Sequence, residues 1–230
     1  MKENKHGKEC STKPITVGIA GISGSGKSDI ALALKKGFEN LEYNTIIIPL
    51  VDYYKNNATD YNNMSAFDIN QLYLDINHLV NGYTITKPRW DFGNRTRSII
   101  REEISPGDFI IVEGIYALAP GMPDYDLSIF VKTDLDVCLK RRLERDRVQR
   151  QMTEEETYSE WDKVKSNLRY VLEQKYEATF VIYWNRDRQW GKKSLEGVSE
   201  VLLYKKALLE NKAPRRVDDM KLDLILGDIS

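Results

Sequence analysis

Residues 21–28 of the chain read Gly-Ile-Ser-Gly-Ser-Gly-Lys-Ser and fit the pattern G-x-x-x-x-G-K-[ST]. They follow a short apolar run, Ile15 to Ala20, that is typical of a buried strand, and they precede apolar residues at helical spacing. A strand before the motif and a helix after it form the context that a P-loop, or Walker A motif, requires. Consecutive backbone N–H groups can then surround phosphate oxygens, and the helix N-terminus adds its dipole. We expect the phosphate-binding residues to be Gly21, Ser23, Gly24, Ser25, Gly26, Lys27 and Ser28.

Two side chains of this loop carry chemistry of their own. We expect Lys27 to lie on an exposed loop and to reach the outer phosphates of a nucleotide, where it serves catalysis. The Ser28 hydroxyl can ligate Mg²⁺. The alternative interpretation is a glycine-rich turn between a strand and a helix, with a lysine that faces solvent.

Two carboxylates stand at the ends of other expected strands. Asp52 follows the apolar run Thr45 to Val51, and Glu113 follows the run Phe109 to Val112. Ligands of open α/β sheets bind beyond the carboxyl ends of the strands. Phosphoryl transfer needs one carboxylate that orients or deprotonates the acceptor hydroxyl and another that holds the metal or its waters. We expect Asp52 to be the base and also, with Ser28 and Glu113, a metal ligand; a solvated strand end is the alternative for each carboxylate.

A basic run lies between Lys140 and Arg150, where six basic residues accompany only two acidic ones. Such a run most often forms a solvated helix face. Beside a phosphate-binding loop, arginines on a lid can instead neutralise the transferring phosphoryl group and exclude water. We therefore expect this run to contribute arginines that face phosphate, with a lid at about residues 140–175. Nucleic-acid binding through this run is a further alternative, although the chain has no recognised module for it.

Strands and helices must alternate to position these groups. Further strands are expected at residues 127–131 and 179–183, and helices at 69–80, 154–175 and 195–209. Ser65 with Asp68 predicts a capping box before the first of these helices, and Thr133 with Asp136 predicts a cap for a helix through Leu143. The pattern predicts an α/β P-loop NTPase fold, a three-layer α/β/α arrangement with a mostly parallel central sheet and a helical lid.

Composition sets limits on function. Across 230 residues, 34 Lys and Arg against 35 Asp and Glu give a formal net charge of −1, so no global basic surface favours nucleic acid or an anionic membrane. We expect a disordered tail at residues 1–13, a single domain at 14–230 and a cytoplasmic protein without a membrane partner. With two cysteines, in the tail and near the basic run, a disulfide is not expected. A homo-oligomer is compatible with the sequence, which does not specify one.

Several motifs occur together in one order along the chain. After the P-loop come Ser65-Ala-Phe-Asp68, Trp90-Asp-Phe92 with Thr96-Arg97, Val112-Glu-Gly-Ile115, Ile129-Phe-Val131 and Arg141-Arg-Leu-Glu-Arg-Asp146. This combination resembles the uridine kinase and phosphoribulokinase-like family of P-loop kinases, over about residues 15–183. The resemblance implies phosphorylation of a small-molecule hydroxyl with ATP and Mg²⁺ as cofactors. It also implies that the acceptor site includes Tyr54, Asn62, Trp90, Phe92 and Arg95. By the same resemblance, Arg142 and Arg145 would be catalytic and Arg150 would contact the nucleotide, all three on the phosphate-facing helix and lid.

Departures from the family pattern affect the base and the acceptor. The family's catalytic Asp aligns with Val51, so Asp52 stands one residue late, and one lid arginine aligns with Met152. An Asp that holds ribose hydroxyls in the family aligns with Asn62, and a base-reading His aligns with Arg95. Because Arg95 would be a permanent cation, we expect uridine and cytidine to be poor acceptors and an anionic or carbonyl-rich group to suit the site. The alternative is an Arg95 that faces solvent and pairs with Asp91.

These observations predict an ATP- and Mg²⁺-dependent kinase that phosphorylates a hydroxyl of a small polar metabolite. The displaced Asp52 leaves a second hypothesis open, namely a nucleotide-binding sensor or pseudo-kinase of the same fold.

Overall fold

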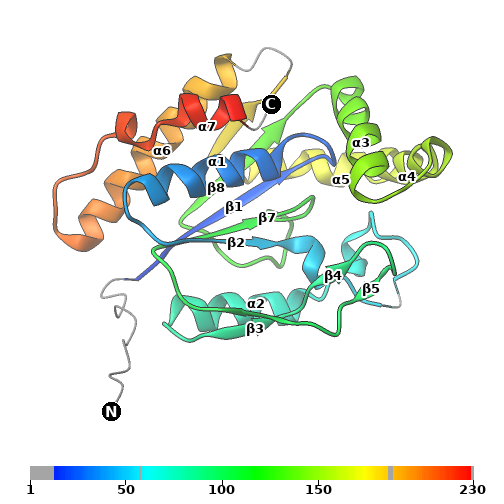
Figure 1. Cartoon of the computed structure of the whole chain (residues 1–230), viewed down its shortest axis with the longest axis horizontal. Coiled ribbons are helices and arrows are strands. Elements are labelled where there is room, and N and C mark those ends of the chain that lie inside the picture. The colour runs from blue at the N-terminus through cyan, green and yellow to red at the C-terminus, as the bar shows by residue number, and fades with distance from the viewer. Residues whose placement is uncertain (1–12, 57, 186–188, 229–230) are drawn as a thin grey trace.

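The computed structural model describes residues 13–56, 58–185 and 189–228. Its centre is a five-stranded parallel sheet in the order β2-β7-β1-β8-β9 (Figure 1). The strands of this sheet are β1 (Ile15–Gly21), β2 (Thr45–Pro49), β7 (Phe109–Glu113), β8 (Leu127–Lys132) and β9 (Phe180–Tyr183). Two antiparallel pairs lie outside it: β3 (Ile85–Lys87) with β6 (Glu102–Ile104), and β4 (Trp90–Asp91) with β5 (Thr96–Arg97).

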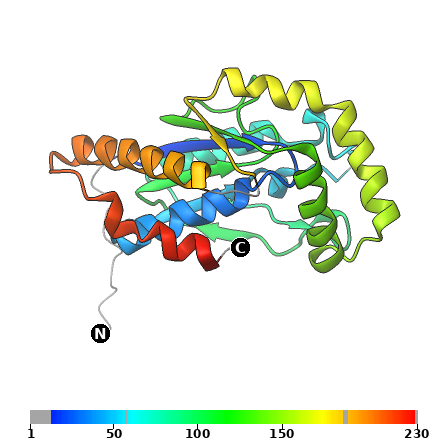
Figure 2. The same cartoon turned by 90° about the horizontal axis from the view of Figure 1, so that it is seen from above.

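Helices cover both faces of the sheet, as Figures 1 and 2 show. The α-helices are α1 (Lys27–Asn40), α2 (Ile69–Val80), α3 (Leu135–Gln149), α4 (Glu154–Ser166), α5 (Leu168–Glu173), α6 (Gln189–Glu210) and α7 (Leu222–Asp228). The 3₁₀ turns are η1 (Leu50–Tyr53), η2 (Met64–Ala66), η3 (Gln174–Tyr176) and η4 (Val217–Met220). The three-layer α/β/α prediction is confirmed.

The strands separate two hydrophobic cores because alternate side chains point to opposite faces of a sheet. On β7, Phe109 and Ile111 pack with α1 and α6, whereas Ile110 and Val112 pack with α2 and the lid helices α4 and α5. All four side chains are fully buried. The sheet is therefore apolar on both faces, as a parallel sheet between helix layers requires.

Strand register brings the P-loop and Glu113 to one edge of the sheet. Glu113 is the last residue of β7 and stands level with Ile19 of β1 and Pro49 of β2. The P-loop begins two residues after Ile19, so its start and the Glu113 carboxylate meet at the carboxyl ends of the strands. The predicted place of Glu113 at a strand end is confirmed.

The segment around Asp52 differs from the sequence prediction. Strand β2 ends at Pro49, and the next four residues form the 3₁₀ turn η1 instead of extending the strand through Val51. Proline supplies no N–H to a ladder, which favours the end of the strand there. Because the chain curls, the alternation of a strand does not set the direction of the Asp52 side chain.

Two predicted helix caps are wrong. Asp68 is itself the cap of α2, where its side chain accepts a hydrogen bond from the Gln71 N–H, and Ser65 belongs to the preceding turn η2. At the start of α3, Asp134 occupies the cap position without a side-chain hydrogen bond. The Thr133 hydroxyl is directed elsewhere, to the P-loop.

The segment 154–175 is helical, as predicted, but breaks at Asn167 into α4 and α5. A capping box at Thr153 and Glu156 begins α4. Apart from Lys13, the predicted N-terminal tail lies outside the described residues. Within the ranges described, no helix combines the length and apolar character needed to cross a membrane.

Candidate active site

The P-loop is shaped by glycines with left-handed backbone. Gly24 and Gly26 have φ angles of 84° and 95°, a region that L side chains rarely adopt. A Cβ at Gly24 would collide with the Cys138 carbonyl oxygen, and one at Gly26 would collide with the Trp184 ring. The loop therefore packs its backbone directly on α3 and on the chain after β9, and α1 begins at Lys27.

Lys27, Ser28 and Glu113 form the polar centre of this loop. The Ser28 hydroxyl donates to a Glu113 carboxylate oxygen at 3.0 Å, and the Lys27 ammonium donates to the Ile22 carbonyl at 3.0 Å. The expectation of an exposed Lys27 is wrong, because its side chain is buried. Burial lowers the pKa of Lys27 to about 8, and the nearby Glu113 carboxylate opposes that change. The loop thus holds a cation whose charge an incoming phosphate would stabilise.

Two side chains outside the motif hold the loop's backbone. The Thr133 hydroxyl lies 2.9 Å from the Ser25 carbonyl and 2.9 Å from the Trp184 carbonyl. An Arg141 Nη1 donates to the same Ser25 carbonyl at 3.5 Å and to the Trp184 carbonyl at 3.1 Å. The sequence analysis missed both roles, and a polar residue at the end of β8 was the only signal for Thr133.

The residues present fit a nucleotide phosphate and Mg²⁺. The Ser25 hydroxyl is buried and has no hydrogen-bond partner among the described residues, so the loop retains a free donor. Ser28 and Glu113 supply two adjacent oxygens, and Mg²⁺ normally takes few protein ligands besides waters and phosphate oxygens. The described residues contain no cluster of three or more His, Cys, Asp or Glu side chains that could hold a metal ion by themselves.

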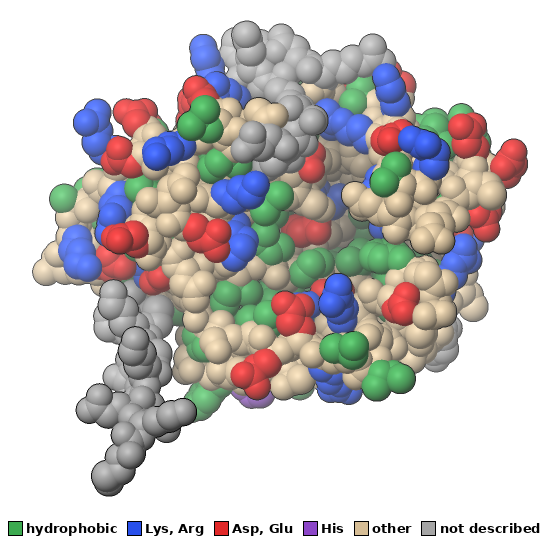
Figure 3. Space-filling view, viewed as in Figure 1, with side chains coloured by type: hydrophobic (Ala, Val, Ile, Leu, Met, Phe, Trp, Pro, Cys, Tyr) green, Lys and Arg blue, Asp and Glu red, His purple; other side chains and the backbone are tan. Residues whose placement is uncertain are grey.

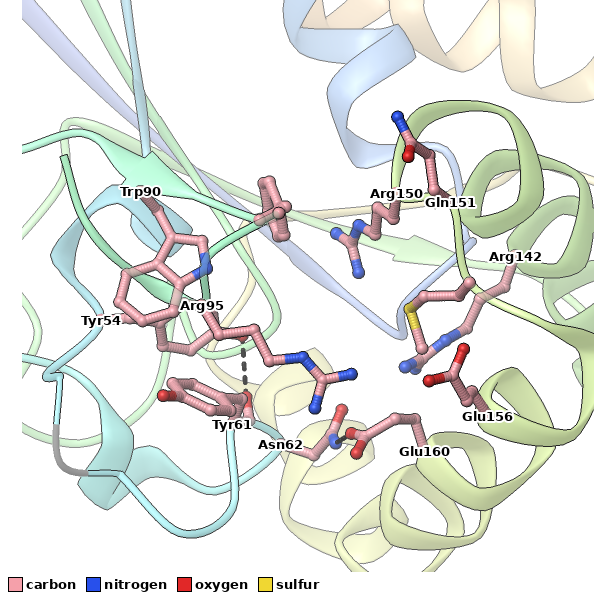
Figure 4. A pocket seen from close by; sticks show the side chains of 13 residues that line it. Tyr54, Tyr61, Asn62, Trp90, Arg95, Arg142, Arg150, Gln151, Glu156 and Glu160 are labelled. Carbon is pink, nitrogen blue, oxygen red and sulfur yellow. Dashed lines mark hydrogen bonds between the residues drawn. The ribbon is translucent and has the colours of Figure 1, made fainter.

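A cavity of about 240 Å³ lies between the β4–β5 hairpin and the helices α3 and α4 (Figure 4). Asn62 borders both this cavity and a small cleft lined by Ile22 and Ser23 of the P-loop, so the cavity adjoins the phosphate-binding loop. All five predicted acceptor residues line it. The lining residues are Tyr54, Tyr61, Asn62, Trp90, Phe92, Gly93, Arg95, Arg142, Arg150, Gln151, Met152, Glu156 and Glu160.

One wall of the cavity is aromatic. The Tyr54 ring lies 5.2 Å from the Trp90 ring and 4.9 Å from the Tyr61 ring, measured between centroids. The Tyr54 hydroxyl donates to the Tyr61 carbonyl at 2.8 Å, the bond dashed in Figure 4. Across the cavity, the Arg150 guanidinium lies 4.1 Å from the centre of the Phe92 ring, a cation–π contact between lid and hairpin.

Asn62 joins the loop before α2 to the lid. Its side-chain amide donates to a Glu160 carboxylate oxygen of α4 at 2.8 Å, and Lys163 donates to the other oxygen at 2.7 Å. Burial alone would raise the pKa of Glu160, but these two hydrogen bonds outweigh it and lower the pKa. Glu160 is thus an ionised residue of α4 that lines the cavity. Sequence analysis missed it, together with Tyr61, Gln151 and Glu156.

The predicted lid arginines share one carboxylate. Asp146 is fully buried and accepts from Arg142 at 3.1 Å and from Arg145 at 2.7 Å, and it lies 3.4 Å from Arg150. Arg145 is not among the residues that line the cavity, and its charge lowers the pKa of Lys27. Arg142 and Arg150 do line it. The basic run therefore serves both the P-loop and the cavity.

Asp52 lies in a buried ion pair. One of its carboxylate oxygens is 2.5 Å from the Lys87 ammonium, and the other accepts the Trp90 N–H at 3.1 Å. Lys87 also pairs with Glu102 at 3.0 Å. Asp52 thus connects the end of β2 to the segment that carries Trp90, and both of its oxygens are in use. It is not among the residues that line the cavity.

The alternative in which Arg95 pairs with Asp91 does not occur in the described part of the chain. The Asp91 carboxylate accepts hydrogen bonds from Gly93 and Asn94, which lower its pKa. Arg95 has a φ of 50°, and Figure 4 shows its guanidinium directed into the cavity.

A parallel α/β sheet with a Walker A loop, a serine–glutamate pair and an adjoining cavity under a helical cover defines the class of P-loop kinases. The chain belongs to the Phosphoribulokinase / Uridine kinase family, whose model matches residues 16–190. It is therefore a member of a family of kinases that act on small metabolites, and the family resemblance seen in the motifs is confirmed.

Similar proteins support this assignment. A uridine kinase of Alkaliphilus metalliredigens (strain QYMF) is 40% identical over 153 residues, which are 61% of this chain and 72% of the relative. One of Macrococcus caseolyticus (strain JCSC5402) is 36% identical over 161 residues, or 65% and 77% of the two chains. The structure of D-glycerate 3-kinase from Cryptococcus neoformans var. grubii is similar with a TM-score of 0.55 and 13% identity, covering 81% of this chain and 91% of that one. This last likeness concerns the fold alone.

Proposed function

We propose that the protein is a kinase that uses ATP and Mg²⁺ to phosphorylate a hydroxyl of a small polar metabolite bound in the cavity. The observation that carries the proposal is the placement of the cavity next to the P-loop, with Asn62 bordering both. The nucleotide and the acceptor would then lie on neighbouring sites, as direct transfer requires, and such transfer depends mainly on position and charge stabilisation.

In this proposal the chain's own residues position the nucleotide and the acceptor and neutralise the negative charge of the phosphates. The P-loop N–H groups and Lys27 bind the nucleotide phosphates, and Ser28 and Glu113 hold Mg²⁺, which when bound neutralises charge that develops on phosphate oxygens. Arg145 and Arg150 contribute positive charge from the lid, α3 to η3, at about residues 140–175. The cation–π contact of Arg150 with Phe92 supports a lid that closes over the acceptor and excludes water.

The experiment is a coupled ADP-release assay over nucleosides, sugar phosphates and hydroxy acids. We expect turnover with at least one acceptor, and a loss of about 10³-fold or more in Lys27→Ala, because the charge on the phosphates is then uncompensated. Lys36→Ala on the same helix is the matched control and should behave as the wild type. Equal turnover and equal ATP affinity in Lys27→Ala would contradict the phosphate-binding role.

A second candidate function is nucleotide binding without transfer. It is favoured by one observation, namely that both oxygens of Asp52 already have partners within the protein. An acceptor hydroxyl would have to displace Lys87 or the Trp90 N–H before Asp52 could act as its base. Tight, Mg²⁺-dependent binding of ATP without turnover of any acceptor would establish this second function.

A further inference from the structure

Two guanidinium groups point toward one another across the cavity. Figure 4 shows Arg95, from the β4–β5 hairpin, and Arg142, from α3, directed into the same space from opposite walls. Arg150 enters from a third direction. Like charges that face each other repel unless an anion lies between them. The arrangement therefore favours the binding of an anion between these groups.

An N–H donor of Arg142 that has no partner supports the same conclusion. The Nη1 of Arg142 is buried and has no hydrogen-bond partner in the described part of the protein, although the Nε of the same group is bound to Asp146. Arg142 as a whole is only 4% exposed. A buried charged donor without a partner is costly, and a ligand oxygen would satisfy it.

The charges around the cavity do not balance. Arg142, Arg145 and Arg150 share the single carboxylate of Asp146. Two glutamates also line the cavity. Glu156 caps α4 at the Thr153 N–H and keeps its negative charge, and Glu160 interacts with both Lys163 and Arg142. Four arginines and Lys163 therefore outnumber Asp146 and these two glutamates. No ion pair or hydrogen bond of Arg95 occurs among the residues that the structure describes. Arg95 therefore brings into the cavity a positive charge that no described carboxylate pairs with.

A nucleotide alone does not account for this surplus. Arg145 is the arginine whose charge acts on Lys27, so it belongs to the P-loop side. Arg95 stands on the opposite hairpin, beside Trp90 and among the aromatic residues of the acceptor wall. Its backbone is held at a left-handed φ of 50°, which is strained for a residue with a Cβ and which often marks functional sites.

We propose that the acceptor carries an oxyanion, a carboxylate or a phosphate ester, which Arg95 and Arg142 bind between them. The proposal rests on the proposed kinase function but concerns only the binding of the acceptor. Guanidinium groups present planar pairs of donors that match carboxylate and phosphate oxygens. The aromatic wall of Tyr54, Tyr61 and Trp90 would contact the uncharged body of the same molecule.

The test compares molecules that differ only in the anion. Binding of uridine and orotidine, which differ by a ring carboxylate, and of ribose and ribose 5-phosphate is measured by calorimetry. Mg²⁺ and a non-hydrolysable ATP analogue are present throughout, so that the P-loop is filled. We expect the anionic member of at least one pair to bind 10-fold or more tightly, and the responding pair identifies a carboxylate or a phosphate. Inorganic phosphate serves as a fragment probe that needs no particular acceptor body.

Variants assign the preference to Arg95. Arg95→Gln should reduce the preference for the anion about 10-fold or more, because the charge-assisted hydrogen bonds of the guanidinium to the anion are lost. Arg89→Gln is the matched control, since Arg89 is an exposed arginine of the same segment that does not line the cavity. Equal binding within both pairs, failure of all four compounds and phosphate to bind, or an unchanged preference in Arg95→Gln would overturn the proposal. An intact preference without ADP release would count against the proposed kinase function alone.

Discussion

The P-loop and the acceptor cavity both place residues at left-handed φ angles, but with opposite chemistry. In the P-loop these residues are Gly24 and Gly26, and in the cavity they are Arg95 and Gln151. Glycine lets the backbone itself approach a ligand, whereas an arginine or a glutamine in the same conformation presents a side chain at the cost of strain. The donor site is thus built from backbone and the acceptor site from side chains.

This contrast explains which amino-acid substitutions each site can accept. A site made of backbone N–H groups binds phosphates in any nucleotide-binding protein of the class, and its residue types are dictated by space. A site made of side chains can change its ligand by substitution of single residues. On the face in Figure 3, basic and acidic side chains are interspersed, so this face presents no broad field of one sign. The proposed preference for an anion would then depend on the cavity residues.

The largest effect should come from adding a side chain to the P-loop. In Gly24→Ala the new Cβ meets the Cys138 carbonyl, and we expect a loss of about 3 kcal/mol in the free energy of unfolding, from left-handed strain and overpacking together. Gly82→Ala is the matched control, because Gly82 has a similar φ of 85° and nothing within 4 Å of its Cβ position. Urea denaturation of both variants measures the difference. Equal losses would show that backbone packing is not what constrains the P-loop.

The Asp52–Lys87 pair should give the next largest effect. We expect Lys87→Met to lower the free energy of unfolding by about 2 kcal/mol, because it leaves the buried Asp52 carboxylate with only the Trp90 N–H. Asp52→Asn should cost less, because Lys87 keeps its ion pair with Glu102. The sequence predicts Asp52 as the general base, whereas the pair supports a positioning role for the Trp90 segment. The two roles separate in kcat for folded protein. A positioning role changes kcat similarly in both variants, and a fall of 10²-fold or more in Asp52→Asn alone would identify the base.

A smaller effect concerns pH at the P-loop. The pKa of Lys27 is about 8 because the side chain is buried, so its charge is present below that pH and is lost above it. Bound phosphates favour the charged form, and binding near pH 8.5 should therefore take up protons. We expect the affinity for an ATP analogue to be constant below pH 8 and to fall by up to about tenfold per pH unit above it. Calorimetry in buffers of different ionisation enthalpy measures both quantities, and a flat affinity up to pH 10 would exclude this role of Lys27.

The smallest effect should be a gain in stability at the acceptor cavity. Arg95→Gly relieves about 1–2 kcal/mol of left-handed strain but adds freedom to the unfolded chain, so we expect a net gain of about 0.5 kcal/mol. The same variant should lose the preference for anionic ligands. A variant that is less stable than the wild type would show that Arg95 is held there for packing.

The sequence predicted the sheet and the P-loop because both follow from local patterns. Apolar runs identify the strands of the sheet, and the spacing of Gly21, Gly26, Lys27 and Ser28 requires one loop geometry. The end of β2 was misplaced because Val51 continues an apolar run while the chain turns after Pro49. A 3₁₀ turn of four residues is too short to produce a recognisable periodic pattern of apolar residues.

The acceptor cavity was predictable only in part. Tyr54, Asn62, Trp90, Phe92 and Arg95 line it, as their motif positions imply. Glu160 and Tyr61 were missed because nothing local distinguishes them from other residues of a polar helix and a loop; tertiary contact alone brings them to the cavity. The Lys87 partner of Asp52 was missed for the same reason, since 35 residues separate the two.

The most direct test of the account follows the γ-phosphate itself. ATP labelled at the γ-phosphate is incubated with Mg²⁺, the wild-type protein and each member of the two matched pairs, and the labelled products are separated from ATP. The account predicts that label passes to an anionic hydroxyl compound, far more slowly to its neutral partner, and not at all in Lys27→Ala. Transfer to uridine or ribose as fast as to orotidine or ribose 5-phosphate, or transfer that persists in Lys27→Ala, would contradict it.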